Sequence, residues 1–367
     1  MLAHPAIDVH QPAARLQVDW ISFRVVCYLC RMWRTHCPTA VISAPGGVMS
    51  DSLLGGVIRL IQSTDGAEIS GWIGRNADQV KARLNEDGIV LLRGFGASDE
   101  QTAERALVQI SDELLDDAFW STPRKGVSGK TFTATEFTAT RSIQLHSEMS
   151  YLPAWPRLIA FHALVVAEEG GATTVCDLET VSRELADLLP AFRDRGVIYQ
   201  RTHRPGVDVP WKTAFQTEDR SRVAEVAKLI DMQLTWLPND ILQTRYKTQG
   251  TVQTEAGDTL WFNQTNIFHP SNLPAQGREQ MTKLFGEAGL PRNAFYGDGA
   301  PIPDAVLQRV NETFARNAYG TPWQVGDVLF IDNMRFAHGR APFSGARKLH
   351  VAMANRHAVP VRTPLFA

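Results

Sequence analysis

Residues 326–353 read GDVLFIDNMRFAHGRAPFSGARKLHVAM, in which a polar connection joins two apolar runs. The length and apolar character of the two runs predict strands that are buried in a core. If the second run is a strand, Arg347 shares a face with Leu349 and Val351, because side chains alternate along a strand. A guanidinium on an apolar face needs a partner. A dicarboxylate ligand would be a suitable bidentate partner, and an internal salt bridge is the alternative.

A second polar stretch, Leu145-His146-Ser147-Glu148, lies far upstream. Residues i and i+2 of a strand project from the same face, so His146 and Glu148 can hold one ion between them. An imidazole with a carboxylate suits Fe(II) when a second histidine completes one face of the octahedron and leaves three positions open. By itself the pair is weak, since about one such pair is expected by chance among the histidines of this chain.

Between and before these stretches, helices alternate with short strands, and strands dominate the second half of the chain. The apolar run 88–94 between two glycines predicts a buried strand, and Ser98-x-x-Gln101 has the form of a capping box that begins a helix. Helices are also predicted around 185–192, 223–230 and 306–314, and strands at 158–166 and 259–263. The regular rhythm of a doubly wound sheet is missing. The pattern therefore predicts a mixed α+β fold with a β-core and helical insertions.

The composition is that of a globular enzyme: 367 residues, 44% hydrophobic and 21% charged. With 37 basic and 39 acidic residues the formal charge is −2, so nucleic acid is not an expected partner. No apolar run approaches about 18 residues, so no membrane span is expected. Four cysteines cannot form a disulfide framework in so long a chain. We therefore expect a cytoplasmic protein.

The first 48 residues differ from the rest. The apolar run Ile21–Trp33 is interrupted by Arg24 and Arg31 and is therefore a poor signal peptide. We expect a poorly structured N-terminal extension over residues 1–48 and one domain over residues 49–367.

Taken together, the polar stretches resemble the taurine-dioxygenase-like (TauD/TfdA) family of Fe(II)/2-oxoglutarate-dependent oxygenases. The resemblance is carried by His146-x-Glu148 and by His338-Gly-Arg-x-Pro-Phe-x-Gly-x-Arg347, and it covers residues 89–353. It is closest to the syringomycin-hydroxylase-like (SyrP-like) branch and extends to clavaminate-synthase-like enzymes. Further stretches that resemble this branch are 88–95, 145–156, 170–173, 261–264, 290–297 and 326–333.

The resemblance implies a double-stranded β-helix (jelly roll) core with helical insertions. It implies that His146, Glu148 and His338 are the ligands of Fe(II), with 2-oxoglutarate and O2 as cosubstrates. It further implies that Arg347 binds the distal carboxylate of 2-oxoglutarate and that Thr173 hydrogen-bonds the same group. Taurine dioxygenase has Asp where this chain has Glu148, which is still a carboxylate. The halogenases of the family lack this carboxylate, so Glu148 argues against halogenation.

The implied activity couples decarboxylation of 2-oxoglutarate to succinate with oxidation of a substrate C–H bond. Hydroxylation is the default outcome, and desaturation, cyclisation or epoxidation are the alternatives. The branch implies an amino-acid-type substrate, free or bound to a carrier protein, and a role in natural-product (antibiotic) biosynthesis. Homo-oligomerisation is compatible with the sequence. A jelly-roll protein that binds metal or ligand without turnover is the alternative of another class.

Residues beside the expected ligands are candidates for the substrate pocket. Arg340 lies two positions after His338, and its alternative role is a brace to Asp332 or another acid. Asn263 is equally consistent with a pocket or a turn. The full set of pocket candidates is Gln144, Met149, Ser150, Tyr151, Asn263 and Arg340.

Overall fold

The computed structural model of the chain describes residues 40–44, 47–96, 99–115, 126–128, 130–133 and 138–358. The predicted N-terminal extension lies outside the described residues as far as position 39. Its last part, residues 40–44 and 47–48, forms one strand and the start of a second, which pair with each other at the edge of a sheet. The predicted boundary at residue 49 therefore falls inside a strand, and the expectation for the residues before 40 stays a prediction.

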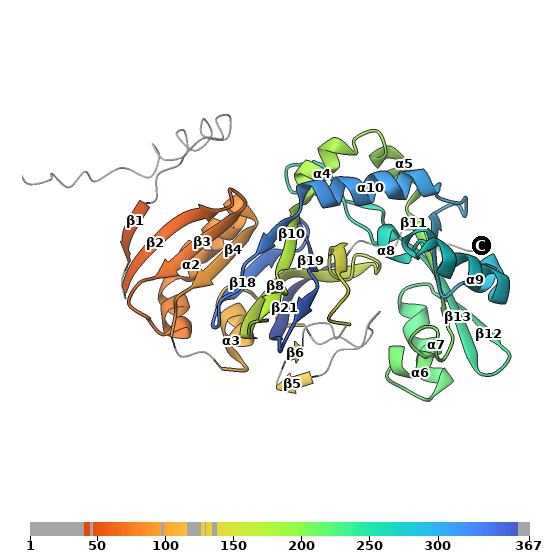
Figure 1. Cartoon of the computed structure of the whole chain (residues 1–367), viewed down its shortest axis with the longest axis horizontal. Coiled ribbons are helices and arrows are strands. Elements are labelled where there is room, and N and C mark those ends of the chain that lie inside the picture. Colours follow the sequence, from red (N-terminus) through yellow and green to blue (C-terminus); the bar gives the residue numbers. More distant parts are fainter. Residues whose placement is uncertain are drawn as a thin grey trace, which may run out of the picture. The chain divides into compact units, whose positions relative to one another are not determined.

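The largest sheet has nine strands in the order β1-β2-β3-β4-β18-β8-β21-β6-β5 (Figure 1). These strands are β1 (Ala40–Ala44), β2 (Gly47–Leu54), β3 (Ile58–Ser63), β4 (Ile89–Arg93), β18 (Val328–Asp332), β8 (Ala154–Val165), β21 (Lys348–Ala358), β6 (Thr131–Thr133) and β5 (Gly126–Ser128). Neighbouring strands are antiparallel except β3 and β4, which are parallel.

A second sheet faces the first across a shared core. Its strands, in spatial order, are β17 (Tyr319–Thr321), β10 (Thr173–Asp177), β19 (Phe336–Arg340) and β7 (Ile143–His146). Val175 of β10 and Phe336 of β19 belong to one buried apolar cluster with Leu329 and Val351 of the large sheet. Two mainly antiparallel sheets packed in this way form the jelly roll that the resemblance implied, and the predicted fold class is confirmed.

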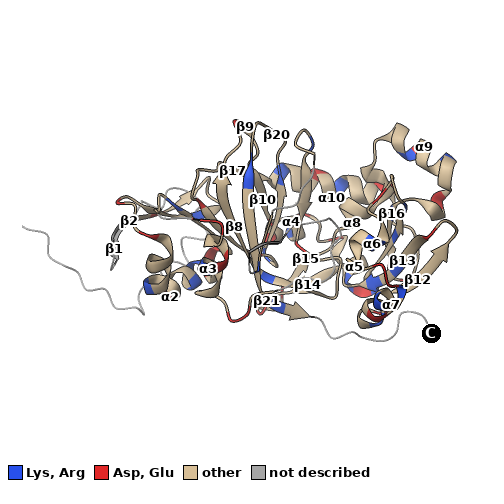
Figure 2. Ribbon diagram, turned by 90° about the horizontal axis from the view of Figure 1, so that it is seen from below, with Lys and Arg blue, Asp and Glu red and all other residues tan. Residues whose placement is uncertain are grey.

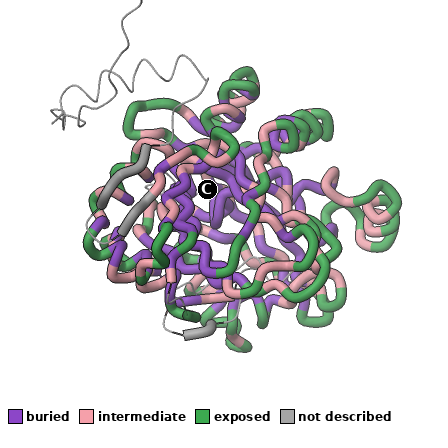
Figure 3. Tube along the Cα trace, turned by 60° about the vertical axis from the view of Figure 1, so that its left-hand side comes forward, coloured by how far each residue is buried: buried purple, intermediate pink, exposed green. Residues whose placement is uncertain are grey.

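Strand β18 is apolar along its length because both faces of the large sheet are covered. Leu329 packs between the two sheets, whereas Phe330 belongs to the buried cluster on the opposite face, together with Trp72. That opposite face is covered by the helices α2 (Ile69–Asp87) and α3 (Thr102–Val108). A strand covered on both faces reads as a continuous apolar run, as this one does. Figure 3 shows the buried segments enclosed by exposed loops and helices.

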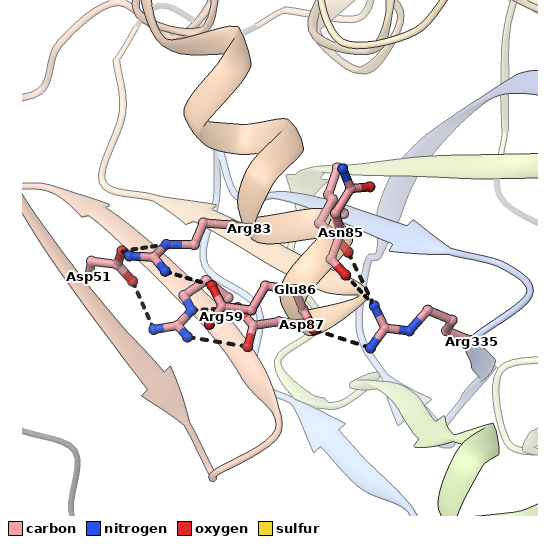
Figure 4. A network of polar contacts seen from close by, with 8 residues as sticks. Asp51, Arg59, Arg83, Asn85, Glu86, Asp87 and Arg335 are labelled. Carbon is pink, nitrogen blue, oxygen red and sulfur yellow. Dashed lines mark hydrogen bonds and ion pairs between the residues drawn. The ribbon is translucent and has the colours of Figure 1, made fainter. Parts of the chain in front are cut away.

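A polar network fixes α2 against the strands beside it (Figure 4). Arg59 of β3 pairs with Asp51 of β2 at 3.1 Å and with Asp87, the last residue of α2, at 2.7 Å. Arg83 of α2 also contacts Asp51, at 2.7 Å. Arg335, just before β19, donates from Nη1 to a main-chain carbonyl at the C-terminal end of α2, at 2.9 Å. Such a bond satisfies one of the carbonyls that a helix end leaves without a partner.

Most helices lie in the long insertion between β10 and β17. The insertion carries a third sheet, in the order β12 (Gln233–Leu237), β13 (Ile241–Thr248), β11 (Val197–His203) and β16 (Arg292–Tyr296). Its helices are α4 (Leu178–Glu184), α5 (Leu189–Arg195), α6 (Trp211–Ala214), α7 (Arg220–Leu229), α8 (Thr265–Phe268), η1 (Pro270–Asn272), α9 (Ala275–Phe285), η2 (Glu287–Gly289) and α10 (Asp304–Asn317). Two short ribbons complete the fold, β14 (Thr251–Gln253) with β15 (Thr259–Trp261), and β20 (Phe343–Ser344) with β9 (Glu169–Gly170).

The predicted strand at 88–94 is β4, and the predicted helix at 223–230 is α7. The single helix predicted around 185–192 is instead the junction of α4 and α5. Pro190, in the first turn of α5, lacks the amide hydrogen that one continuous helix would need.

The predicted capping residue Ser98 lies outside the described residues. Within the described part of the chain, no helix is long and apolar enough to cross a membrane.

Candidate metal centre

The three side chains expected to bind iron lie together beside the small sheet. His146 is the last residue of β7, and His338 lies directly opposite it in β19, with ring centroids 4.6 Å apart. Oε2 of Glu148 is 3.7 Å from Nε2 of His338. One ligand atom from each of the three side chains lies within 4.8 Å of the others. The structure therefore brings together residues that are far apart in the sequence.

Glu148 reaches this position in a way that strand alternation does not describe. Strand β7 ends at His146, so Glu148 lies in the turn that follows and not on the strand. The next residue, Met149, has a φ of 57°, in the left-handed region that non-glycine residues seldom adopt. The expected convergence of His146 and Glu148 is present, but a turn and not a strand face produces it.

The hydrogen bonding of the two imidazoles suits a metal site. Nδ1 of His146 lies 2.8 Å from the carbonyl oxygen of Gln144 and must donate to it, because a carbonyl oxygen only accepts. Nε2 of His146 is then the nitrogen with a lone pair for a metal. Nδ1 of His338 is buried and has no hydrogen-bond partner among the described residues, while its Nε2 faces Glu148. Two imidazoles and one carboxylate are a donor set that fits Fe(II).

A buried asparagine holds the turn that carries Glu148. Asn333, just after β18, is fully buried. Its Oδ1 accepts from the amide of Glu148 at 2.7 Å, and its Nδ2 donates at 2.9 Å each to the carbonyls of Glu148 and Pro156. Sequence reasoning assigned no role to Asn333. The only signal was its place at the end of the stretch 326–333.

Three further side-chain amides hold neighbouring carbonyls of the same segment. Asn266 donates to the carbonyl of Leu145 at 3.0 Å, and Gln264 donates to that of Ser147 at 2.8 Å. Gln249 donates to the carbonyls of Ser150 at 3.0 Å and Leu152 at 2.9 Å. These amides satisfy buried carbonyls without placing another charge beside the metal ligands. The segment that carries two of the three ligands is therefore fixed from several elements at once.

Replacement of Asn333 by alanine is expected to weaken iron binding by about 10- to 100-fold, the usual effect of losing a group that orients a ligand. It leaves buried main-chain groups of Glu148 and Pro156 without a partner, so the melting temperature should fall as well. Asn76→Ala is the matched control, because Asn76 is a buried asparagine of α2 that donates to the carbonyl of Trp72. Calorimetric titration with Fe(II) under anaerobic conditions measures both variants. Equal iron affinity in the two would show that Asn333 supports only the fold.

A second group of side chains is suited to an anion. Arg347 precedes β21, and its Nε donates to the carbonyl of Gly171 at 2.9 Å. Burial, with the nearby charge of Arg340, lowers the pKa of Arg347 to about 10. Within the described residues no carboxylate forms an ion pair with Arg347. The internal salt bridge that the sequence left open is therefore absent there, and the half-buried guanidinium fits a carboxylate of 2-oxoglutarate.

Thr173 begins β10 directly opposite Arg340 of β19. Its Oγ1 accepts a hydrogen bond from Nε1 of Trp323 at 3.1 Å. An indole nitrogen only donates, so the hydroxyl proton of Thr173 remains available for an anionic oxygen. Trp323 was not identified from the sequence, since nothing there shows that it lies beside a residue 150 positions away.

The pocket candidates have contacts of several kinds. Arg340 donates from Nη2 to the carbonyls of Thr138 and Arg141, at 2.7 and 2.8 Å. Asn263 accepts from the amide and the hydroxyl of Thr265, which is the role of a turn residue. The side chain of Gln144 contacts Asn272 of η1, Ser150 donates to the carbonyl of Ser147, and Met149 and Tyr151 belong to a buried apolar cluster. Their contact with a substrate stays a prediction.

Comparisons with known proteins identify the family of the chain. A family model described as taurine catabolism dioxygenase TauD, TfdA family, matches residues 58–353. The chain is 33% identical to the dapdiamide synthesis protein DdaC of Enterobacter agglomerans over 272 residues, which are 74% of this chain and 83% of the relative. It is 26% identical to a clavaminate synthase-like protein of Arabidopsis thaliana over 279 residues, 72% of this chain and 81% of the relative. The PvcB protein of Pseudomonas aeruginosa has a similar fold, with a TM-score of 0.50 and 16% identity over 87% of this chain and 94% of that chain.

Proposed function

Because the chain belongs to the TauD/TfdA family of Fe(II)/2-oxoglutarate-dependent dioxygenases, we propose that it hydroxylates a C–H bond of an amino-acid-type substrate. The observation that carries this proposal is the convergence of His146, Glu148 and His338 from two strands and a turn. The iron centre, when bound, supplies the oxidation that couples decarboxylation of 2-oxoglutarate to cleavage of the substrate C–H bond. The side chains around the iron bind the metal, the cosubstrate and the substrate.

His146, Glu148 and His338 are the proposed metal ligands. Two neutral imidazoles and one carboxylate leave a divalent cation with one positive charge, which favours a further anionic ligand such as a 2-oxo acid. Arg347 and Thr173 are proposed to hold the distal carboxylate of that acid. Charge-assisted hydrogen bonds from Arg347, and one from Thr173, orient the cosubstrate before the substrate enters.

The amino-acid-type substrate is supported by the similarity to DdaC, a protein named for dapdiamide synthesis. A role in natural-product biosynthesis, with the substrate free or attached to a carrier protein, is proposed on the same ground. The pocket residues of a family are where its members differ, so the similarity does not extend to the identity of the substrate.

Anaerobic absorption spectroscopy tests the cofactor assignment. We expect a weak visible charge-transfer band when 2-oxoglutarate is added to the protein with Fe(II), and succinate on admission of oxygen. Screening amino acids and carrier thioesters for a change of the band, followed by mass spectrometry of the product, tests the substrate class. A mass gain of one oxygen atom is the expected result. A folded, iron-loaded protein that shows neither the band nor succinate would favour binding without turnover.

A further inference from the structure

The third sheet carries a buried group of charges that the proposed reaction does not use. Arg201 of β11 and Arg292 of β16 are directly opposite each other, and Asp208 follows β11. Arg201 donates two hydrogen bonds to the carboxylate of Asp208, at 2.6 and 3.0 Å. Arg292 shares the same carboxylate at 3.0 Å and, less closely, at 3.4 Å. One carboxylate thus faces two guanidiniums.

This group holds one positive charge that no described neighbour balances. Burial would raise the pKa of Asp208, but the two guanidiniums hold it below its usual range, so Asp208 carries its full negative charge. Burial and the charge of Arg201 lower the pKa of Arg292. The adjacent His203 is neutral, because burial lowers its pKa to about 4. Tyr246, whose pKa burial raises well above its usual value, is neutral too.

Contacts place the group on the side of the sheet that faces the metal centre. The hydroxyl of Tyr199, on β11, accepts from the amide of Gln264 at 2.7 Å, and the side chain of Gln264 holds the carbonyl of Ser147. Because side chains alternate along a strand, Tyr199 and Arg201 lie on the same face of β11. Figures 1 and 2 both show α8, which follows Gln264, between β10 and the third sheet.

Arg292 is linked to the metal-bearing segment through one aromatic ring. Its guanidinium lies 5.5 Å above the ring of Phe268, at the end of α8. That ring is 5.8 Å from Tyr151, which follows Glu148 by three positions. A ring below the guanidinium holds its plane in place by a cation–π contact.

The accessibility of the group differs between its members. The side chains of Arg201 and Asp208 are 4% and 8% exposed, whereas that of Arg292 is 26% exposed. Water therefore reaches Arg292, whereas Arg201 and Asp208 are almost completely enclosed. Asp208 occupies Nε and Nη2 of Arg292, and Nη1 makes no hydrogen bond within the described residues. The end of the guanidinium is available to a ligand.

We propose that Arg292 binds a carboxylate of the substrate, so that the substrate is an amino acid with a free carboxylate and not a carboxamide or thioester at that position. This inference rests on the proposed function and deepens it by naming the recognised group. Nη1 and Nη2 form a fork that fits both oxygens of a carboxylate, and binding neutralises the unbalanced charge. Asp208 and Phe268 act as positioning residues, because they fix the plane and direction of the fork.

Ligand-dependent melting tests the proposal with the full chain, loaded with Zn(II) and 2-oxoglutarate so that no turnover occurs. The probes are the proteinogenic L-amino acids and their carboxamides, with the dicarboxylic members separating recognition of the α-carboxylate from recognition of a side-chain carboxylate. We expect at least one amino acid to bind tenfold or more tightly than its carboxamide. Arg292→Met should remove that difference. If no carboxylate binds more tightly than its amide, the proposal is wrong.

The matched control is Arg195→Met. Arg195 also lies over an aromatic ring, at 3.7 Å from the centroid of Tyr296, and pairs with an aspartate, Asp298, at 2.7 Å. This variant should retain the preference for the carboxylate. An equal loss of the preference in both variants would contradict a specific role of Arg292.

Melting without any ligand gives a second, independent measurement. Arg292→Met removes the unbalanced charge and leaves the neutral pair of Arg201 and Asp208, so its melting temperature should equal or exceed that of the wild type. Asp208→Asn leaves two buried cations and should melt much lower. A similar large fall in both would identify a structural ion group and overturn the proposal. The wild-type protein with Fe(II) and 2-oxoglutarate keeps this outcome separate from the proposed function. If it shows neither the charge-transfer band nor succinate, that function fails, while the preference for the carboxylate can still be measured with the Zn(II) protein.

Discussion

Replacement of His338 by alanine is expected to abolish turnover and to weaken iron binding by more than about 100-fold. Loss of a group that merely orients a ligand costs about 10- to 100-fold in metal affinity, and loss of a ligand itself should cost more. His338 is the only one of the three ligands that comes from β19, so no neighbour in its strand can replace it. The bound iron, measured by calorimetry and by metal analysis after gel filtration, checks this result.

The control for His338 is a buried histidine away from the centre. His162 of β8 is fully buried and has no hydrogen-bond partner on either ring nitrogen within the described residues. Burial lowers its pKa to about 4, so it is a neutral core side chain. His162→Ala should lower the melting temperature but retain iron affinity. Full retention of turnover by His338→Ala, with His162→Ala equally active, would remove His338 from the ligand set.

Glu148→Gln provides a variant that preserves volume if His338→Ala fails to fold. Its side chain keeps the size of glutamate but loses the charge, so the site offers a divalent cation only neutral donors. Iron affinity should fall while the circular dichroism spectrum remains that of the wild type. Unchanged iron affinity in a folded Glu148→Gln protein would contradict coordination by this carboxylate.

The sequence predicts the strands of the jelly roll well because the local pattern of apolar residues shows which strands are buried. Residues 328–331 are apolar on both faces of the strand, and both faces are covered in the structure. The ligand set is a prediction of another kind, since it comes from the resemblance carried by the motifs around His146 and His338. Glu148 shows the limit of such reasoning. Alternation places it on a strand, whereas the structure places it in a turn that is held by Asn333, just after β18.

The residues that sequence reasoning missed depend on pairings between distant segments. Trp323 meets Thr173 only because β17 and β10 pair, and Arg292 meets Arg201 only because β16 pairs with β11. Hydrophobic periodicity shows which face of a strand is buried but not which strand lies beside it. Arg201 and Arg292 also look like ordinary surface residues in the sequence. That two guanidiniums share one carboxylate becomes visible only when the sheet is assembled.

Replacement of Arg347 by alanine is expected to raise the dissociation constant of 2-oxoglutarate by about 10- to 100-fold. A hydrogen bond to a charged group contributes about 1.5–3 kcal/mol, and each 1.4 kcal/mol changes an equilibrium constant about tenfold. Arg347→Lys should fall between the two, because lysine keeps the charge but loses the planar fork. Titration of the anaerobic Fe(II) protein with 2-oxoglutarate, followed by the visible band, measures all three proteins.

The choice of 2-oxo acid makes the role of Arg347 specific. 2-Oxobutyrate has the 2-oxo acid group but no distal carboxylate, so it should bind the wild type and Arg347→Ala equally weakly. Arg335→Ala is the matched control, since Arg335 also donates to main-chain carbonyls, but to those at the C-terminal end of α2. It should preserve the preference for 2-oxoglutarate over 2-oxobutyrate. If Arg347→Ala preserved that preference too and changed only the affinity for the amino-acid substrate, Arg347 would belong to the substrate pocket, and the distal carboxylate would have to be held by other residues.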